Sequence, residues 1–296
     1  FEEVENAYGK VSGTWQEADE IYAKNSGTWE LVFAAFTATS LTTLSSGSGT
    51  FTVPDGANAI HIQASVGGGG GAMRGVDYDK ADGESAGAGG GSGAYVSDKV
   101  FTVTTGETIS YSVGSSGANG TGTYSGSAGG GASTTISGST TGSIFTLTGG
   151  GGASASGGGV QGPLRSNTAG TAGSDTISGS VITSGNFRDT DGATKSVTTL
   201  TSGPVGTFNQ SGNGAVGGNN GNCGGDNCQI GGSTGAASYS GNVSGGAGSP
   251  VGTSTNGAAG TRGSGGGGGG AQYGPGSTQG GSGGTGEIQY RFLRVN

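Results

Sequence analysis

The chain has few of the residues on which catalytic sites and nucleic-acid surfaces depend. Charged residues make up 10% of its 296 residues, and the formal net charge is −8. A surface this poor in positive charge does not attract phosphate backbones, so we expect no nucleic-acid partner. A single histidine, His61, is present, and no partnered nucleophile motif accompanies it. We therefore predict that the protein is not an enzyme and that His61 faces the surface from a strand.

Long apolar runs are also missing. The longest, residues 31–36, is far shorter than a bilayer span, so we expect no membrane insertion. Hydrophobic residues amount to only 29% of the chain. Disordered chains combine low hydrophobicity with high charge and few β-branched residues, whereas this one is rich in Thr, Ser, Val and Ile. The chain opens on Phe1 without a secretion signal, so we expect it to begin inside a longer or processed precursor.

Cysteine is nearly absent. Cys223 and Cys228 are separated by four residues, two of them glycine, and such a segment can close a small disulfide loop. Free thiols are the alternative, while a metal site is least expected because it needs about four ligands and the single histidine is remote. A disulfide would indicate an oxidising exterior.

Acidic residues gather in two short segments. The first holds Asp77, Asp79, Asp82 and Glu84, and the second holds Asp189 and Asp191. Calcium takes several carboxylate oxygens around a glycine turn. The spacing does not match an EF-hand loop, however, and Lys80 interrupts the first segment. We expect solvated acidic loops and no cofactor, with calcium at Asp77, Asp79 and Asp82 as the alternative.

Glycine, in contrast, supplies 75 of the 296 residues and stands in blocks that follow β-type strands. The longest blocks are residues 67–71, 149–152 and 265–270. A flexible spacer is one interpretation. The alternating strands on both sides favour another, in which backbones pack so closely that no Cβ fits between them. Near residues 218–224 glycine falls at every third position, the period of a left-handed three-residue helix whose N–H and C=O groups bond to neighbouring segments.

Alternating apolar residues predict several strands between the glycine blocks. In residues 59–66, isoleucine, alanine and valine alternate with His61, Gln63 and Ser65, the pattern of a half-buried strand. Further strands are expected at 50–53, 95–103, 108–113, 133–136, 144–148 and 287–295. Helix should be nearly absent because glycine and β-branched residues disfavour it. We predict an all-β fold, a glycine-rich and jelly-roll-like β-sandwich with packed polyglycine II helices.

The first 36 residues form a different module. The segment YGKVSGTW at 8–15 recurs as YAKNSGTW at 22–29, and each copy places a Ser-Gly turn between short strands, a hairpin signal. Hairpins this small cannot bury a core alone. We expect them to pack on copies of the chain or on a partner through Tyr8, Trp15, Tyr22 and Trp29, an attachment and oligomerisation role rather than a Trp-lined ligand site. Residues 37–49 are the predicted linker, and 50–296 the glycine-rich β domain.

Isolated aromatic residues emerge from the polar, glycine-rich segments. A tyrosine on a Gly/Ser loop gives a large contact area at low entropic cost, so we predict receptor contacts; the alternative is that some fill gaps in the glycine stack. The candidates are Tyr78, Tyr124, Phe187, Phe208, Tyr239 and Tyr273.

Five segments together resemble the glycine-rich domain of tailed-bacteriophage tail fibres and receptor-binding adhesins. They are TFTVPDG (50–56), IHIQASVGGGGG (60–71), GAGGGSGAYV (87–96), VTTGETISYSVG (103–114) and LTGGGGA (147–153). The amino-terminal repeats also look like those that precede such domains. The resemblance implies an extracellular virion protein at the tail periphery that touches the host surface. In related adhesins, polyglycine II helices form a sandwich whose distal loops recognise the receptor.

These observations predict a tail-fibre or adhesin protein without enzymatic activity. Its repeats would attach it to other tail proteins, and its loops would bind an outer-membrane protein or glycan of the host cell, with affinity raised by multivalency. One alternative is a self-assembling extracellular filament or matrix protein. Another is an ice-binding protein, against which the absence of regular Thr-x-Thr ladders counts.

Overall fold

The computed structural model shows an all-β chain, as predicted. Its described part contains β-strands and one 3-10 turn, η1 (Val197–Thr199), but no α-helix. No helix in that part is long and apolar enough to cross a membrane. The described residues are 8–17, 20–25, 28–34, 36–72, 76–77, 84–121, 126–156, 166–200, 210–212, 222–223, 229–230, 233–238, 244–250, 256–269, 271–272 and 278–296.

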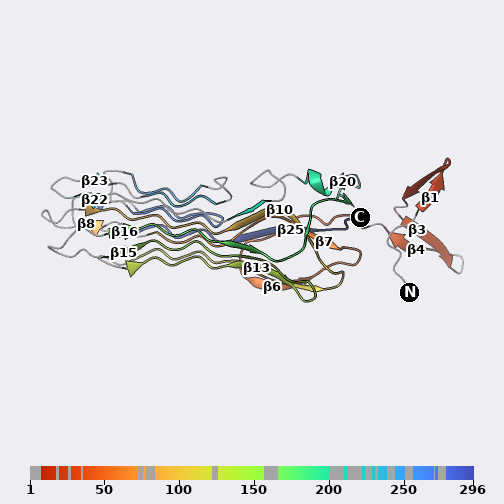
Figure 1. Ribbon diagram of the computed structural model, residues 1–296, viewed down its shortest axis with the longest axis horizontal. Coiled ribbons are helices and arrows are strands. Elements are labelled where there is room, and N and C mark those ends of the chain that lie inside the picture. The colour runs from red at the N-terminus through yellow and green to blue at the C-terminus, as the bar shows by residue number, and fades with distance from the viewer. Residues whose placement is uncertain are drawn as a thin grey trace.

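Two antiparallel sheets form the centre of the molecule (Figure 1). The first has the order β18-β10-β7-β25-β5, and β21 also pairs with β10. Its strands are β5 (Thr42–Leu44), β7 (Ala59–Val66), β10 (Tyr95–Thr102), β18 (Val181–Ile182), β21 (Gln210–Gly212) and β25 (Glu287–Leu293). The carboxyl-terminal strand β25 lies between β7 and β5, so the chain returns to the sheet near which it began.

The second sheet has the order β17-β14-β13-β11-β6. Its strands are β6 (Ser48–Thr52), β11 (Thr108–Ser112), β13 (Thr134–Gly138), β14 (Gly142–Leu147) and β17 (Asp175–Ile177). All of the strands predicted from alternation lie in these two sheets; β7 has the predicted bounds, and the ends of the others differ from the predicted ones by at most two residues.

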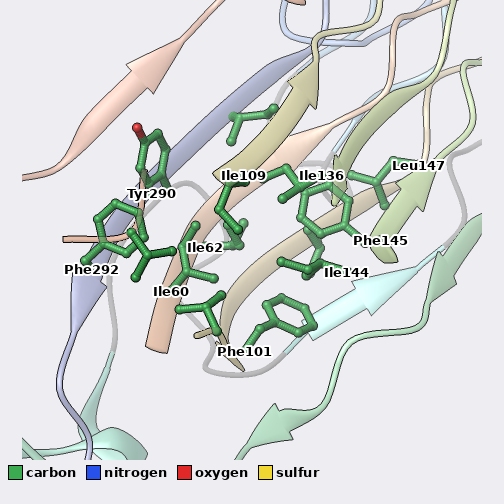
Figure 2. Close-up of a cluster of buried hydrophobic side chains, with 14 of the residues drawn as sticks. Ile60, Ile62, Phe101, Ile109, Ile136, Ile144, Phe145, Leu147, Tyr290 and Phe292 are labelled. Carbon is green, nitrogen blue, oxygen red and sulfur yellow. The ribbon is translucent and has the colours of Figure 1, made fainter. Parts of the chain in front are cut away.

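The main hydrophobic core lies between the two sheets (Figure 2). Ile60 and Phe101 come from the first sheet, and Ile109, Ile136 and Phe145 come from the second; all five side chains are fully buried. Burying one such side chain contributes about 1.5–3 kcal/mol. The two sheets are therefore held face to face by apolar burial, as the predicted sandwich requires.

The predictions that β7 is half-buried and that His61 faces the surface are wrong. Seven of its eight residues are buried, including His61, whose exposed fraction is 1%. At the start of β7 the reason is a second apolar cluster on the outer face of the first sheet, where Phe187, Val197 and Leu200 pack on Ala59; Ala64 and Val66 lie in a separate cluster with Tyr95. Residues 185–200, which we call the cover, carry Phe187, Val197 and Leu200. They contain a hairpin of β19 (Asn186–Arg188) and β20 (Thr194–Ser196), followed by η1.

The glycine segments extend from the sheets as neighbouring extended backbones (Figure 1). Along residues 67–72, successive amides donate to three different segments in rotation, and amides three residues apart donate to the same segment, at 2.8–2.9 Å. The donor–acceptor pairs are Gly67 to Ala94, Gly68 to Ala132, Gly69 to Gly284, Gly70 to Gly91, Gly71 to Gly129 and Ala72 to Gly281. A three-residue helix would make this pattern; that these segments are polyglycine II helices stays a prediction.

The spacing of these backbones explains why glycine is needed. A Cβ added to Gly69 would lie 1.9 Å from the carbonyl oxygen of Ser264, and one added to Gly70 would lie 2.0 Å from that of Gly151. Both distances are impossible for real atoms. The expectation of backbones too close for a Cβ is confirmed, and a flexible spacer is excluded for residues 67–71.

The repeats at the amino-terminal end form hairpins, as predicted. β1 (Tyr8–Val11) pairs with β2 (Thr14–Glu17), and β3 (Glu20–Asn25) pairs with β4 (Thr28–Ala34). In the first turn Ser12 and Gly13 both have positive φ, 50° and 88°, which fits the tight turns that favour hairpins. Figure 1 shows the hairpins at one end of the long axis, near the carboxyl terminus.

Small sheets lie along the glycine segments, away from the hairpins (Figure 1). One joins β8, β9 and β22; a second joins β12, β15 and β16; a third joins β23 and β24. Their bounds are β8 (Val76–Asp77), β9 (Glu84–Ser85), β22 (Asn222–Cys223), β12 (Gly126–Ser127), β15 (Ser154–Ser156), β16 (Ser166–Thr168), β23 (Gln229–Ile230) and β24 (Ala271–Gln272).

Glu107 ties two turns of the sandwich together. Its carboxylate accepts hydrogen bonds from the amides of Thr104, Thr140 and Thr141 and from the hydroxyl of Thr141. The residue is 5% exposed. Burial alone would raise the pKa of Glu107, but these hydrogen bonds outweigh it and lower the pKa from its usual 4.5.

We predict that Gly131→Ala and Gly130→Ala have very different effects. A Cβ on Gly131 would lie 2.1 Å from the carbonyl oxygen of Gly68, whereas the nearest atom to a Cβ on Gly130 would be 3.5 Å away. Gly131→Ala should lower the free energy of unfolding by at least about 3 kcal/mol, and Gly130→Ala by less than about 1 kcal/mol. Urea unfolding measures both. Equal losses in the two variants would contradict the close backbone contact.

We predict that Glu107→Gln is less stable than the wild type by about 1–3 kcal/mol near pH 7, because the amide nitrogen of glutamine cannot accept the turn hydrogen bonds. The lowered pKa means that Glu107 stabilises the fold above its unfolded pKa of about 4.5, and that this stability is lost as the pH falls through the lower folded value. The difference between the proteins should therefore shrink towards about pH 3. Urea titrations at the two pH values would show it; a gap that stays constant would argue against this role.

Candidate functional site

Five short strands, β8, β9, β22, β23 and β24, contact one another at the end of the molecule away from the hairpins. β23 contacts both β9 and β22, and β24 contacts β8 and β9. Residues 78–83 connect β8 to β9, residues 224–228 connect β22 to β23, and residues 273–277 follow β24. We call these strands the distal cluster. Figure 1 places β8, β22 and β23 side by side at this end.

The distal cluster brings together chain positions that are far apart in the sequence. Tyr78 directly follows β8, and Tyr273 directly follows β24, so two of the predicted receptor contacts are adjacent to this cluster in the chain. Five candidates lie outside the described residues, and their contact role stays a prediction. These are Tyr78, Tyr124, Phe208, Tyr239 and Tyr273.

Phe187 is the one candidate that the structure describes, and its expected role is corrected. Its side chain is 2% exposed and lies in the cluster under the cover. The guanidinium carbon of Arg291 lies 5.5 Å from the centre of its ring, a cation–π contact. Phe187 therefore packs the cover onto the sheet, which is closer to the gap-filling alternative than to a display loop.

The cysteine and acidic segments also reach the distal cluster. Cys223 in β22 pairs with Glu84 in β9, and Glu84 pairs with Asp77 in β8. Cys228, Asp79 and Asp82 lie outside the described residues, so the disulfide and the calcium alternative stay untested. Among the residues that the structure does describe, no group of three or more His, Cys, Asp or Glu is placed to hold a metal ion.

A second polar site lies beneath the cover, on the outer face of the first sheet. His61, Asp98 and Arg291 stand on the neighbouring strands β7, β10 and β25. Arg291 Nε donates a hydrogen bond to His61 Nδ1 at 3.3 Å. On the other side of the ring, His61 Nε2 lies 3.5 Å from Asp98 Oδ1 without hydrogen-bond geometry, a contact that becomes an ion pair only when His61 is protonated. Both carboxylate oxygens of Asp98 are buried without a hydrogen-bond partner.

Arg291 connects this site to the cover. Its Nη1 donates to Asp189 Oδ1 at 2.6 Å, and Lys195 Nζ donates to Asp189 Oδ2 at 2.6 Å. Lys195 also lies 3.1 Å from Asp191. The prediction of a solvated acidic loop is wrong for Asp189, whose side chain is 9% exposed, and right for Asp191, at 57%. A cavity of about 410 Å³ opens beside these groups, lined also by Gln63 and Thr199.

Burial, hydrogen bonds and neighbouring charges together set the pKa values of this site. It lowers the pKa of His61, as does the charge of Arg291, while Asp98 and Asp189 oppose the shift. Burial also raises the pKa of Asp98. For Asp189, burial alone would raise the pKa, but the bonds from Lys195 and Thr190 and the charge of Arg291 lower it. His61 is therefore neutral near pH 7 and accepts the Arg291 bond at Nδ1.

The comparisons with known proteins identify one family. The family described as a glycine-rich domain matches residues 42–293, most of the chain. The search of curated proteins found no match to the chain.

We predict that Arg291→Met destabilises the fold far more than Lys195→Met. The Arg291 side chain is 16% exposed and bonds to two nearly buried groups, so its loss removes the donor to His61 Nδ1 and leaves the Asp189 carboxylate with Lys195 and the Thr190 amide. We expect a loss of about 2–4 kcal/mol. The Lys195 side chain is 40% exposed, and its removal should cost less than about 1 kcal/mol. Urea unfolding compares the variants; a larger loss for Lys195→Met would show that the network is not centred on Arg291.

Proposed function

The chain belongs to the glycine-rich domain family, and we propose that it is a tail-fibre or adhesin protein of a tailed bacteriophage. In this proposal it is a structural virion protein without enzymatic activity. The distal cluster presents loops to a receptor on the host surface, and the amino-terminal hairpins attach the protein to the tail. The resemblance of five segments to phage adhesins supports this assignment.

The polarity of the molecule is the observation that carries the proposal. The hairpins lie at one end of the long axis with the carboxyl terminus next to them, and the distal cluster lies at the other end (Figure 1). A protein that bridges a virion and a cell needs two separated ends with different roles. The amino-terminal end has the sequence repeats, and the distal end has the segments that carry Tyr78 and Tyr273.

The glycine segments suit the task of presenting loops. Their backbones are hydrogen-bonded to neighbours on several sides, so the strands that flank the distal loops start from fixed positions. A fixed base lowers the entropy that a loop loses on binding. Aromatic side chains on such loops would then supply contact area, and several copies on one virion would multiply the affinity.

The hairpins supply the proposed attachment surface. Two-stranded hairpins do not bury a core of their own, and the apolar side chains of Tyr8 and Ile21 are 59% and 38% exposed. These side chains would be covered by another tail protein or by copies of the same chain. The protein would then be homo-oligomeric or bound to a fibre in the virion.

The experiment is a binding assay with purified protein, intact cells of the bacterial host and the phage itself. We expect the protein to bind the cells and to compete with the phage for adsorption. Tyr78→Ser and Tyr273→Ser should each weaken cell binding about 10-fold or more, as hot-spot tyrosines do. Protein that neither binds the cells nor slows adsorption would contradict the proposal.

Tyr8→Ser is the matched control, because it makes the same chemical change at the opposite end. It should leave the binding of the purified protein to cells unchanged and reduce its incorporation into virions. If Tyr8→Ser lowered cell binding as much as Tyr273→Ser, the proposed division of roles between the two ends would be wrong.

A further inference from the structure

The cover bonds to the predicted linker and to the carboxyl terminus. The amide of Ala38, in the predicted linker, donates to the carbonyl of Arg188 in β19 at 2.8 Å. Asn186 and Asn296 exchange two backbone hydrogen bonds, at 3.1 and 3.0 Å. The cover thus holds both the segment that leads to the hairpins and the carboxyl terminus.

Two kinds of contact hold the cover on the sheet. One is apolar, where Phe187, Val197 and Leu200 pack on the outer face. The other is the bond from Arg291 Nη1 to Asp189 Oδ1. Arg291 is oriented for this bond by its second hydrogen bond, from Nε to His61 Nδ1. The charged contact therefore depends on the protonation state of the histidine.

A protonated His61 cannot accept this bond. Protonation at Nδ1 removes the lone pair and places a positive charge beside the guanidinium group. The charged groups that face His61 are Asp98 from β10, Arg291 from β25 and Asp189 from the cover. The chain has no other histidine, so no second imidazole titrates in the same range.

We propose that the cover is a pH-sensitive clamp on the linker, closed while His61 is neutral and loosened when His61 takes up a proton. Loosening would break the backbone hydrogen bonds that Ala38 and Asn296 make with the cover, while Thr39 stays bonded to Phe292 of the sheet. This inference concerns the contact between the cover and these two segments and does not depend on what the distal loops bind.

Proton linkage gives the direction in which pH shifts the equilibrium between the closed and the open cover. Burial lowers the pKa of His61 in the closed state from its usual 6.5, and a solvated imidazole in the open state regains that value. Protons therefore favour the open state as the pH falls below about 6.5. Asp98 opposes the change while it is ionised. Burial raises the pKa of Asp98, so its opposition weakens as the pH falls.

Hydrogen exchange measured by mass spectrometry on the full chain tests this clamp. After correction for intrinsic exchange rates, protection across residues 185–200 and at Ala38 should fall by up to about tenfold between about pH 7.5 and pH 5.5. Protection in β13 and β14, which belong to the second sheet, should stay constant. Protection of the cover that does not change with pH would overturn the proposal.

Variants separate the histidine from a general effect of acid. His61→Gln keeps an acceptor for Arg291 but does not titrate, so the cover should stay protected at both pH values. A loss of protection in this variant as large as that in the wild type would overturn the proposal.

Asp189→Asn weakens the clamp without removing the histidine and should lower protection even at about pH 7.5. Asp191→Asn makes the same change two residues away, does not touch Arg291 and should behave as wild type. Equal behaviour of the two aspartate variants would also overturn it.

Discussion

The contact between carbonyl oxygens and glycine Cα atoms is the constraint on which the rest of the structure depends. Where a side chain would begin on Gly69 or Gly70, a neighbouring carbonyl oxygen already stands. This spacing allows successive amides of one segment to reach several neighbours in turn. The region is stabilised by backbone hydrogen bonds, which normally contribute about 1 kcal/mol each, and it needs little apolar burial. Low hydrophobicity and an ordered fold are therefore compatible in this chain.

The apolar sandwich has a complementary role at the base of the glycine segments. Its core holds β7 and β10 between two layers, and the glycine run 67–71 follows directly from β7. The position of the first glycine segment is thus fixed by a strand that cannot slip, because a shift by one residue would move Ile60 and Ile62 out of the core and place His61 in it. The sandwich sets the register of the strands, and the glycine segments continue from these strands towards the distal cluster.

Local patterns revealed the strands, the hairpins and the close backbone packing, because alternation and glycine spacing are properties of short segments. The bounds of β7 agreed with the prediction at both ends. The burial of His61 was missed for a physical reason. The alternation of His61 with isoleucine shows only that it lies on the face of β7 opposite the core. Its burial on that face comes from the cover, more than a hundred residues away in the chain. The pairing of Arg291 with Asp189 likewise depends on topology. Arg291 alternates with apolar residues in β25, and that pattern only places it on the polar face.

The close backbone packing also restricts how such a protein can change over generations. At Gly69, Gly70 and Gly131 any other side chain collides with main-chain atoms, and a colliding main chain cannot move aside as a side chain can. These positions are therefore closed to any side chain, whereas Gly130, with the nearest atom 3.5 Å from an added Cβ, is not. Substitutions and insertions are least costly where chain segments leave the packed backbones. A glycine scaffold of this kind confines change in sequence to the segments between its packed backbones.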